Sequence, residues 1–191
     1  NTPCVYVTHQ LFIQTGNRLL NKIAQRIHYH FINKYDECWI PDCDGPQNLA
    51  GKLSHPAILP RIPVKYLGAL SRFKKHDFAI KYNLLIILSG PEPQRSLFED
   101  MLISQLKNHK GPVVLVRGLP GSGKKLYNGM THLVIHDHLP ANELNELIQQ
   151  SENIIARCGY STVMDLVTLK HKAILVPTPC QTKQEYLADY L

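Results

Sequence analysis

The sequence predicts an α/β protein built on doubly wound, mainly parallel sheets. Apolar runs of strand length alternate with segments of helical periodicity, and this alternation is typical of parallel sheets covered on both faces. A tight glycine turn also separates an expected strand at 153–156 from an expected helix at 160–169, as a doubly wound fold has at its ligand crevice. With 191 residues, 44% of them hydrophobic, the chain is long enough to form such a core.

The first part of the chain combines short strands with one long helix. Strands are expected at 3–8, at the start of 38–42 and at 64–68, and a helix within 16–35. Apolar residues at helical spacing within this helix are Leu19, Leu20, Ile23, Ala24, Ile27 and Phe31. Aromatic Tyr29, Phe31 and Tyr35 fall mostly at core-like positions.

The second part follows a hinge expected at 71–77. Its elements are strand 84–88, helix 94–108, strand 113–117, strand 131–135, helix 140–150, strand 153–156, helix 160–169, strand 173–177 and a helix from 182. We therefore expect two domains, 1–75 and 76–191, the second incomplete at its C-terminus.

Positive charge is concentrated in the first part. Residues 1–81 hold eleven Lys or Arg against five Asp or Glu, whereas residues 82–191 hold ten of each. This asymmetry favours an anionic partner, either a membrane surface or nucleic acid. On the expected helix, Arg18, Lys22, Arg26 and His30 form a basic stripe suited to anionic lipid heads, although a solvated helix face has the same pattern. Few aromatic residues interleave with the stripe, which argues against nucleic acid.

Targeting features and cysteines indicate a cytoplasmic protein. No apolar run approaches the ~20 residues that cross a bilayer, and no signal peptide opens the sequence. Five cysteines form no metal-binding spacing, and an odd number argues against a disulfide framework. Because the sequence starts inside an expected strand and stops within an expected helix, we expect it to be a piece of a longer chain.

The turn at 159–162 has the chemistry of a nucleotide site. Backbone N–H groups at the start of a helix carry partial positive charge and suit a phosphate or a sugar hydroxyl. Asp165 lies one helical turn further on, where its carboxylate can accept from both hydroxyls of a ribose diol. Ser89 and Gly90 follow the strand at 84–88 and offer a second backbone contact to phosphate, although two nearby prolines remove donors.

Two other motifs compete with this interpretation. The segment 118–125 nearly spells a P-loop, but Lys125 stands where a magnesium-binding Ser or Thr is required and no helix follows. His132, His136 and His138 alternate along a strand and imitate a metal site, without the defined ligand set that zinc catalysis needs. We interpret the first as a surface loop and the second as a strand end.

The segment 154–186 resembles the donor half of GT-B glycosyltransferases related to the bacterial UDP-N-acetylglucosamine transferase of the lipid-linked peptidoglycan precursor. The positions that match are Arg157, Gly159, Thr162, Asp165, Gln184 and Glu185. Departures are Cys158 for Ser, Asp165 for the longer Glu, and Glu185 for a second Gln. Weaker similarity covers 5–10, 67–72 and 84–95.

The resemblance implies a GT-B fold with Rossmann-like domains and transfer of a sugar, N-acetylglucosamine or a similar one, from a UDP-sugar to a lipid-linked or cell-envelope acceptor. The donor-site residues it implies, with those argued above, are Arg72, Ser89, Gly90, Ile135, His136, Arg157, Gly159, Tyr160, Ser161, Thr162, Asp165, Gln181, Gln184 and Glu185. His9 is the local candidate for the general base. Arg72 lies in the expected hinge, so it is alternatively a surface charge that contacts only solvent. We expect no cofactor or metal, and a peripheral location on the inner face of the plasma membrane. The alternatives are a non-catalytic UDP-sugar-binding partner subunit and a P-loop-like nucleotide-binding protein.

Overall fold

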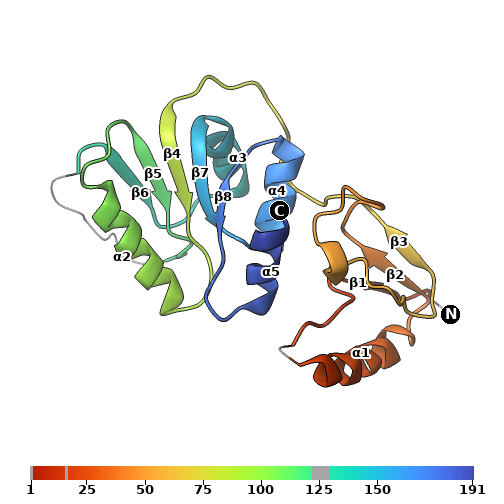
Figure 1. The fold of residues 1–191 in the computed structure, drawn as a ribbon. Helices are drawn as coiled ribbons and strands as arrows, with labels where there is room; N and C mark the ends of the chain where they lie inside the picture. The colour runs from red at the N-terminus through yellow and green to blue at the C-terminus, as the bar shows by residue number, and fades with distance from the viewer. Residues whose placement is uncertain (1, 16, 122–129) are drawn as a thin grey trace. The chain divides into compact units, whose positions relative to one another are not determined.

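The computed structural model describes residues 2–15, 17–121 and 130–191, and these divide into two compact units (Figure 1). The first unit consists of Asn1–Leu70 with Cys180–Leu191, and the second of Ser71–Pro179. The domain division expected after residue 75 stays a prediction. No helix in the described ranges is long and apolar enough to cross a membrane.

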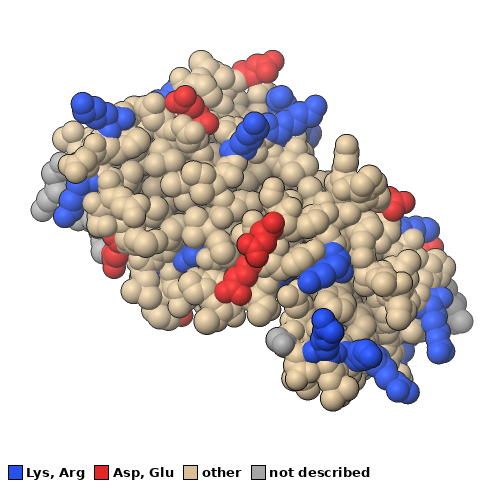
Figure 2. Space-filling view, in the orientation of Figure 1, with Lys and Arg blue, Asp and Glu red and all other residues tan. Residues whose placement is uncertain are grey.

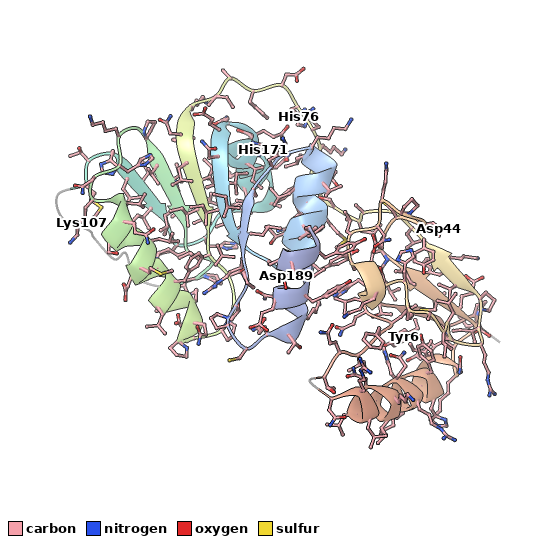
Figure 3. The ribbon with its side chains drawn as sticks, in the orientation of Figure 1. Tyr6, Asp44, His76, Lys107, His171 and Asp189 are labelled. Atoms are coloured by element: carbon pink, nitrogen blue, oxygen red, sulfur yellow. The ribbon has the colours of Figure 1, made fainter. Side chains whose placement is uncertain are left out.

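The first unit is a three-stranded parallel sheet with helical cover. Its elements are β1 (Val5–Val7), α1 (Arg18–Ile32), β2 (Glu37–Ile40), the short 3-10 helix η1 (Gly51–Leu53), β3 (Val64–Tyr66) and α5 (Thr182–Tyr190). The strand order is β1-β2-β3, and all pairs are parallel. Leu11, Ile32, Cys38 and Ile40 form its core. Tyr6 of β1, labelled in Figure 3, places its hydroxyl 3.4 Å from His28 Nε2 of α1.

Helix α1 begins where its sequence provides a cap. The side chain of Asn17 accepts hydrogen bonds from the backbone N–H groups of Leu19 and Leu20, as an N-cap does. Burial differs from the sequence expectation, because Phe31 is 54% and Tyr35 37% exposed although both were expected at core-like positions. The helix instead turns Ile32 toward the sheet.

Helix α1 therefore carries an outward-facing apolar ridge, defined by Leu19, Leu20, Ile23, Ile27 and Phe31. These five side chains are 49–66% exposed. Periodicity fixes which residues of a helix share a face, but it does not fix what covers that face.

The second unit is a five-stranded, fully parallel sheet. Its elements are β4 (Tyr82–Ile87), α2 (Gln94–Leu106), β5 (Val113–Val116), β6 (Leu133–His136), α3 (Ala141–Gln149), β7 (Ser151–Arg157), α4 (Tyr160–Leu169) and β8 (Ile174–Val176). The strand order is β6-β5-β4-β7-β8. The expected succession of strands and helices is confirmed to within a few residues at each end.

Both faces of this sheet are covered by helices, as Figure 1 shows. Successive strand residues point to opposite faces, so Leu85 packs in one apolar cluster and Ile86 in another. The Leu85 cluster includes residues of α3 and α4, and the Ile86 cluster includes residues of α2. The doubly wound α/β architecture predicted from the sequence is therefore confirmed.

The strand order reverses between β4 and β7. From β4 the chain moves outward through β5 and β6, and then returns to β7 and continues to β8 on the other side. Neighbouring crossovers leave in opposite directions at such a point, and open α/β sheets bind ligands outside the carboxyl ends of the strands there. Ser89 and Gly90 follow β4 at this edge, and Gly159 follows β7.

Candidate functional site

The start of α4 offers backbone donors without a competing side chain. Gly159 is the N-cap residue, with φ −84° and ψ 136°, and no side chain within 2–15, 17–121 or 130–191 caps this end of the helix. Residues three apart lie on one helix face, so Thr162 and Asp165 share a face with the exposed Ser161. The side chain of Tyr160 is instead buried. The α4 start thus combines a positive helix end with hydroxyl and carboxylate groups.

Arg157, the last residue of β7, is a buried cation that pairs with no carboxylate among the described residues. It is 4% exposed, and its guanidinium lies 4.1 Å from the centroid of the Phe98 ring. Its Nη1 donates to the carbonyl of Pro177 and its Nη2 to that of Gln94, both at 2.9 Å. In the described part of the chain, Nε has no hydrogen-bond partner. Burial lowers the pKa of this guanidinium, because the charge is removed from water.

Two other buried arginines at the same edge are neutralised. Arg95 and Arg117 both bind the buried carboxylate of Glu99, and Arg117 also binds Asp137 at 2.8 Å. Burial alone would lower the pKa of Arg117, but the hydrogen bonds to Asp137 and Glu99 raise it. Of these three arginines, Arg95 and Arg117 are paired with carboxylates, whereas Arg157 has no such pair within the described ranges.

The loop after β4 approaches the loop after β8. Gly90 has φ +103°, a left-handed conformation that favours glycine, and a Cβ placed on it would lie 3.8 Å from Thr178 Oγ1. Ser89 and Gly90 are exposed, and Thr178 is buried. The structure thus brings the ends of β4 and β8 together beside the Arg157 contacts.

Asp165 meets the segment expected to be the hinge. Ser71 Oγ donates to Asp165 Oδ1 at 2.5 Å, and the backbone N–H of Phe73 donates to Ser71 Oγ at 3.0 Å. Burial raises the pKa of Asp165, whereas the Ser71 hydrogen bond and the charge of Arg72 lower it. Arg72 itself is exposed. Arg72 and Asp165, both predicted site residues, therefore lie close enough to interact.

Ile135 and His136 end the edge strand β6, at the carboxyl edge but separated from β7 by β5 and β4. Asp137 follows them and is held by Arg117.

The P-loop-like residues 122–125 lie outside the described residues. His132 Nε2 lies 3.2 Å from the carbonyl oxygen of Leu106, and the described ranges contain no group of three His, Cys, Asp or Glu side chains placed to hold a metal ion.

The remaining predicted site residues belong to the first unit. A hydrogen bond joins Lys183 Nζ to His9 Nε2, and burial first, then the charge of Lys183, lowers the pKa of His9 to about 4. An imidazole of such low basicity is a poor general base at neutral pH. Gln184 donates to the side-chain oxygen of Gln181 at 2.7 Å, and Glu185 accepts from the backbone N–H of Cys180 at 2.9 Å.

Sequence reasoning missed two residues of this region, Ser71 and Thr178. Ser71 immediately precedes Arg72, so its position beside a candidate phosphate ligand was a usable signal. Thr178 lies between two prolines after the strand at 174–176, where a loop at the carboxyl edge is expected. Neither signal indicates which element the hydroxyl meets, because those contacts join distant parts of the chain.

Comparisons with known proteins relate parts of this chain to glycosyltransferases. Residues 129–191 match the glycosyltransferase family 28 C-terminal domain. A solved structure described as the glycotransferase of kitacinnamycin is similar over 97% of this chain, with a TM-score of 0.58 and 11% sequence identity. No curated protein sequence matches the chain.

The chain spans about half, 55%, of the length of that solved structure. At this level of identity the structural match concerns the fold. The chain therefore has an α/β fold of the GT-B type, and its C-terminal third is similar to the family 28 glycosyltransferase domain.

Proposed function

We propose that the second unit binds the nucleotide-sugar donor of a glycosyltransferase, with a UDP-sugar such as UDP-N-acetylglucosamine as the donor. The observation that carries the proposal is the uncompensated charge of Arg157 at the strand-order reversal. Burying an unpaired charge is costly, and an anion bound at this edge would supply the missing counter-charge. The uncapped start of α4 provides hydrogen-bond donors for the same anion.

In this proposal the diphosphate contacts the start of α4, Ser89 and Gly90. The buried Arg157 lies beneath these groups and supplies positive charge. Arg72 adds a second positive charge from the solvent side. The ribose hydroxyls donate to Asp165, and the base lies toward Ile135 and His136. Positive groups aimed at the diphosphate would also stabilise the charge that develops on the departing UDP. No residue is assigned as the general base, because His9 is weakly basic.

The test is calorimetric binding of UDP to the wild type and to Arg157→Met and Arg157→Lys. Loss of a charge-assisted interaction should weaken UDP binding by about tenfold to a hundredfold in Arg157→Met, with partial recovery in Arg157→Lys. Lys107→Met, which removes an exposed positive charge at the other end of α2, is the matched control and should bind as wild type.

Binding of ATP with magnesium separates the P-loop alternative. ATP binding that is lost in Lys124→Ala, with no binding of UDP, would replace the glycosyltransferase proposal by a P-loop-like protein. A chain that binds UDP-sugar but neither transfers nor hydrolyses it with any acceptor offered would favour the non-catalytic partner subunit.

The acceptor side of the proposal is a lipid-linked acceptor reached at an anionic membrane surface. The apolar ridge of α1 lies beside the basic stripe, and α1 contains no acidic residue (Figure 2 shows Lys and Arg gathered over this helix). At about 100° per residue, ridge and stripe occupy neighbouring arcs of the helix, and the sheet-facing Ile32 occupies a third. This arrangement is typical of a helix lying in the interface of an anionic bilayer.

The groove beside the stripe supports the same partner. Arg18, Lys22 and Arg26 line a groove of about 480 Å³ together with apolar side chains that include Tyr29 and Ile58. Tyr29 Oη donates to the carbonyl of Ile58 at 2.5 Å, which holds the groove wall in place. A phosphate group with an attached aliphatic chain matches both the charge and the apolar surface.

A further inference from the structure

Ser71 lies in the linker segment 71–77 and contacts the Asp165 carboxylate, which is proposed to bind ribose. Its hydroxyl donates to Asp165 Oδ1 and accepts from the backbone N–H of Phe73. In the described part of the chain, this is the hydrogen bond that the Asp165 carboxylate receives, and Oδ2 receives none. The carboxylate is thus held by one oxygen.

The segment that carries Ser71 is itself anchored. Phe73 is 4% exposed and packs in the same apolar cluster as Leu166 and Leu169 of α4. Asp165 precedes Leu166 on that helix. The segment is therefore fixed against α4 by the core packing of Phe73, which does not depend on the Ser71 hydroxyl, so removing the hydroxyl should leave the segment in place.

We propose that Ser71 is a positioning residue that orients the Asp165 carboxylate so that its second oxygen accepts from the ribose hydroxyls. This inference rests on the proposed donor site. A carboxylate binds both hydroxyls of a ribose diol only in one orientation. An aspartate side chain has two rotatable torsions, so a contact that restrains them favours this orientation. With Oδ1 held, Oδ2 is left to accept from the sugar. The adjacent Arg72 would then meet the diphosphate, so one segment of chain would contact two parts of the nucleotide.

The electrostatics of the pair give a second, measurable consequence. Burial raises the pKa of Asp165, and the Ser71 hydroxyl and Arg72 oppose that increase. Removing the hydroxyl should raise this pKa further, because the ionised carboxylate loses a hydrogen bond. If the ionised form binds the ribose, affinity for UDP falls as pH drops through this pKa, and the fall should begin at a higher pH in the variant.

The experiment compares Ser71→Thr with Ser71→Val, two variants of nearly equal shape that differ in the hydroxyl. Calorimetry with UDP and 2′,3′-dideoxy-UDP is done from neutral to acidic pH, and thermal unfolding checks that each variant folds. We expect Ser71→Val to lose about threefold to tenfold in UDP affinity, the effect of one hydrogen bond. Ser71→Thr should bind as wild type, and the dideoxy analogue should bind all three proteins equally.

The possible results distinguish the role of Ser71 from the existence of the donor site. If Ser71→Val binds UDP with the wild-type affinity and pH profile, Ser71 does not position the carboxylate. Equal losses for UDP and the dideoxy analogue would mean that the hydroxyl supports the linker as a whole, which also overturns the inference. Wild-type protein that fails to bind UDP at all would remove the proposed donor site, and the inference with it.

Discussion

At the level of single residues, charges at the carboxyl edge of the second unit are of two kinds. Arg95 and Arg117 are neutralised by Glu99 and Asp137, and such buried networks fix local structure. Arg157 instead donates from Nη1 and Nη2 to two backbone carbonyls, which accept hydrogen bonds but bring no negative charge. The resemblance alone predicted Arg157 as a site residue. What distinguishes Arg157 from Arg95 and Arg117 depends on contacts between distant parts of the chain, such as the bond to Gln94, 63 positions away.

Asp165 gives a prediction at this scale. Asp165→Asn keeps the shape and the acceptor oxygen for Ser71 but removes the charge, so UDP affinity should fall by about tenfold to a hundredfold. Calorimetry with UDP and 2′,3′-dideoxy-UDP checks this. The dideoxy analogue should bind both proteins alike, and an Asn variant that binds UDP as tightly as wild type would make Asp165 merely a half-buried partner of Ser71.

The same substitution should affect stability in the opposite direction. Burial raises the pKa of Asp165 above its ordinary value, so the stability that this group contributes is present below the unfolded pKa and is lost as pH rises through the folded pKa. At neutral pH the ionised side chain therefore destabilises the empty protein. Unfolding by denaturant should show Asp165→Asn to be the more stable protein at neutral pH, with the difference disappearing in acid.

At the level of elements, the sequence located strands and helices well and their environments less well. Apolar runs of strand length identified β4, β5 and β7, because strands buried on both faces are apolar throughout. The glycine turn and helical periodicity identified α4. Helix α1 was equally clear as a helix, yet the residues of its apolar ridge proved to be exposed. The contact between Ser71 and Asp165 was not predicted, since no local pattern relates a linker hydroxyl to a helix 94 residues away.

Helix α1 gives the prediction at this scale. Liposomes containing anionic lipid should bind the protein, and the triple variant Arg18→Ala, Lys22→Ala, Arg26→Ala should lose roughly a hundredfold in partitioning, at about 1 kcal/mol per basic residue. Ile23→Asp with Ile27→Asp should abolish insertion of the apolar ridge. Moderate salt should release the wild type, because exposed charges are screened over ~8 Å.

The matched control removes three exposed lysines from the second unit, as Lys74→Ala, Lys75→Ala and Lys81→Ala. It changes the net charge equally and should bind liposomes as wild type does. Binding lost equally in both triple variants would indicate a non-specific charge effect. A stable dimer that the Ile23 and Ile27 substitutions dissociate would assign the ridge to a second copy of the chain.

At the level of the whole molecule, one side chain connects three segments at the carboxyl edge of the second unit. Arg157 connects the end of β7 with the start of α2 through Gln94 and with the loop after β8 through Pro177. These three places are separated by 63 and 20 positions in the sequence. None of the three loops can move far without breaking a bond to the same guanidinium.

This shared anchor implies that the three loops open and close as one cooperative unit. Amide hydrogen exchange at 89–94, 157–162 and 177–179 should proceed at correlated rates, because local opening exposes them together. Binding of UDP should slow exchange in all three segments by a common factor, including the segment after β8. In Arg157→Met the three rates should separate, and each loop would then report its own local stability.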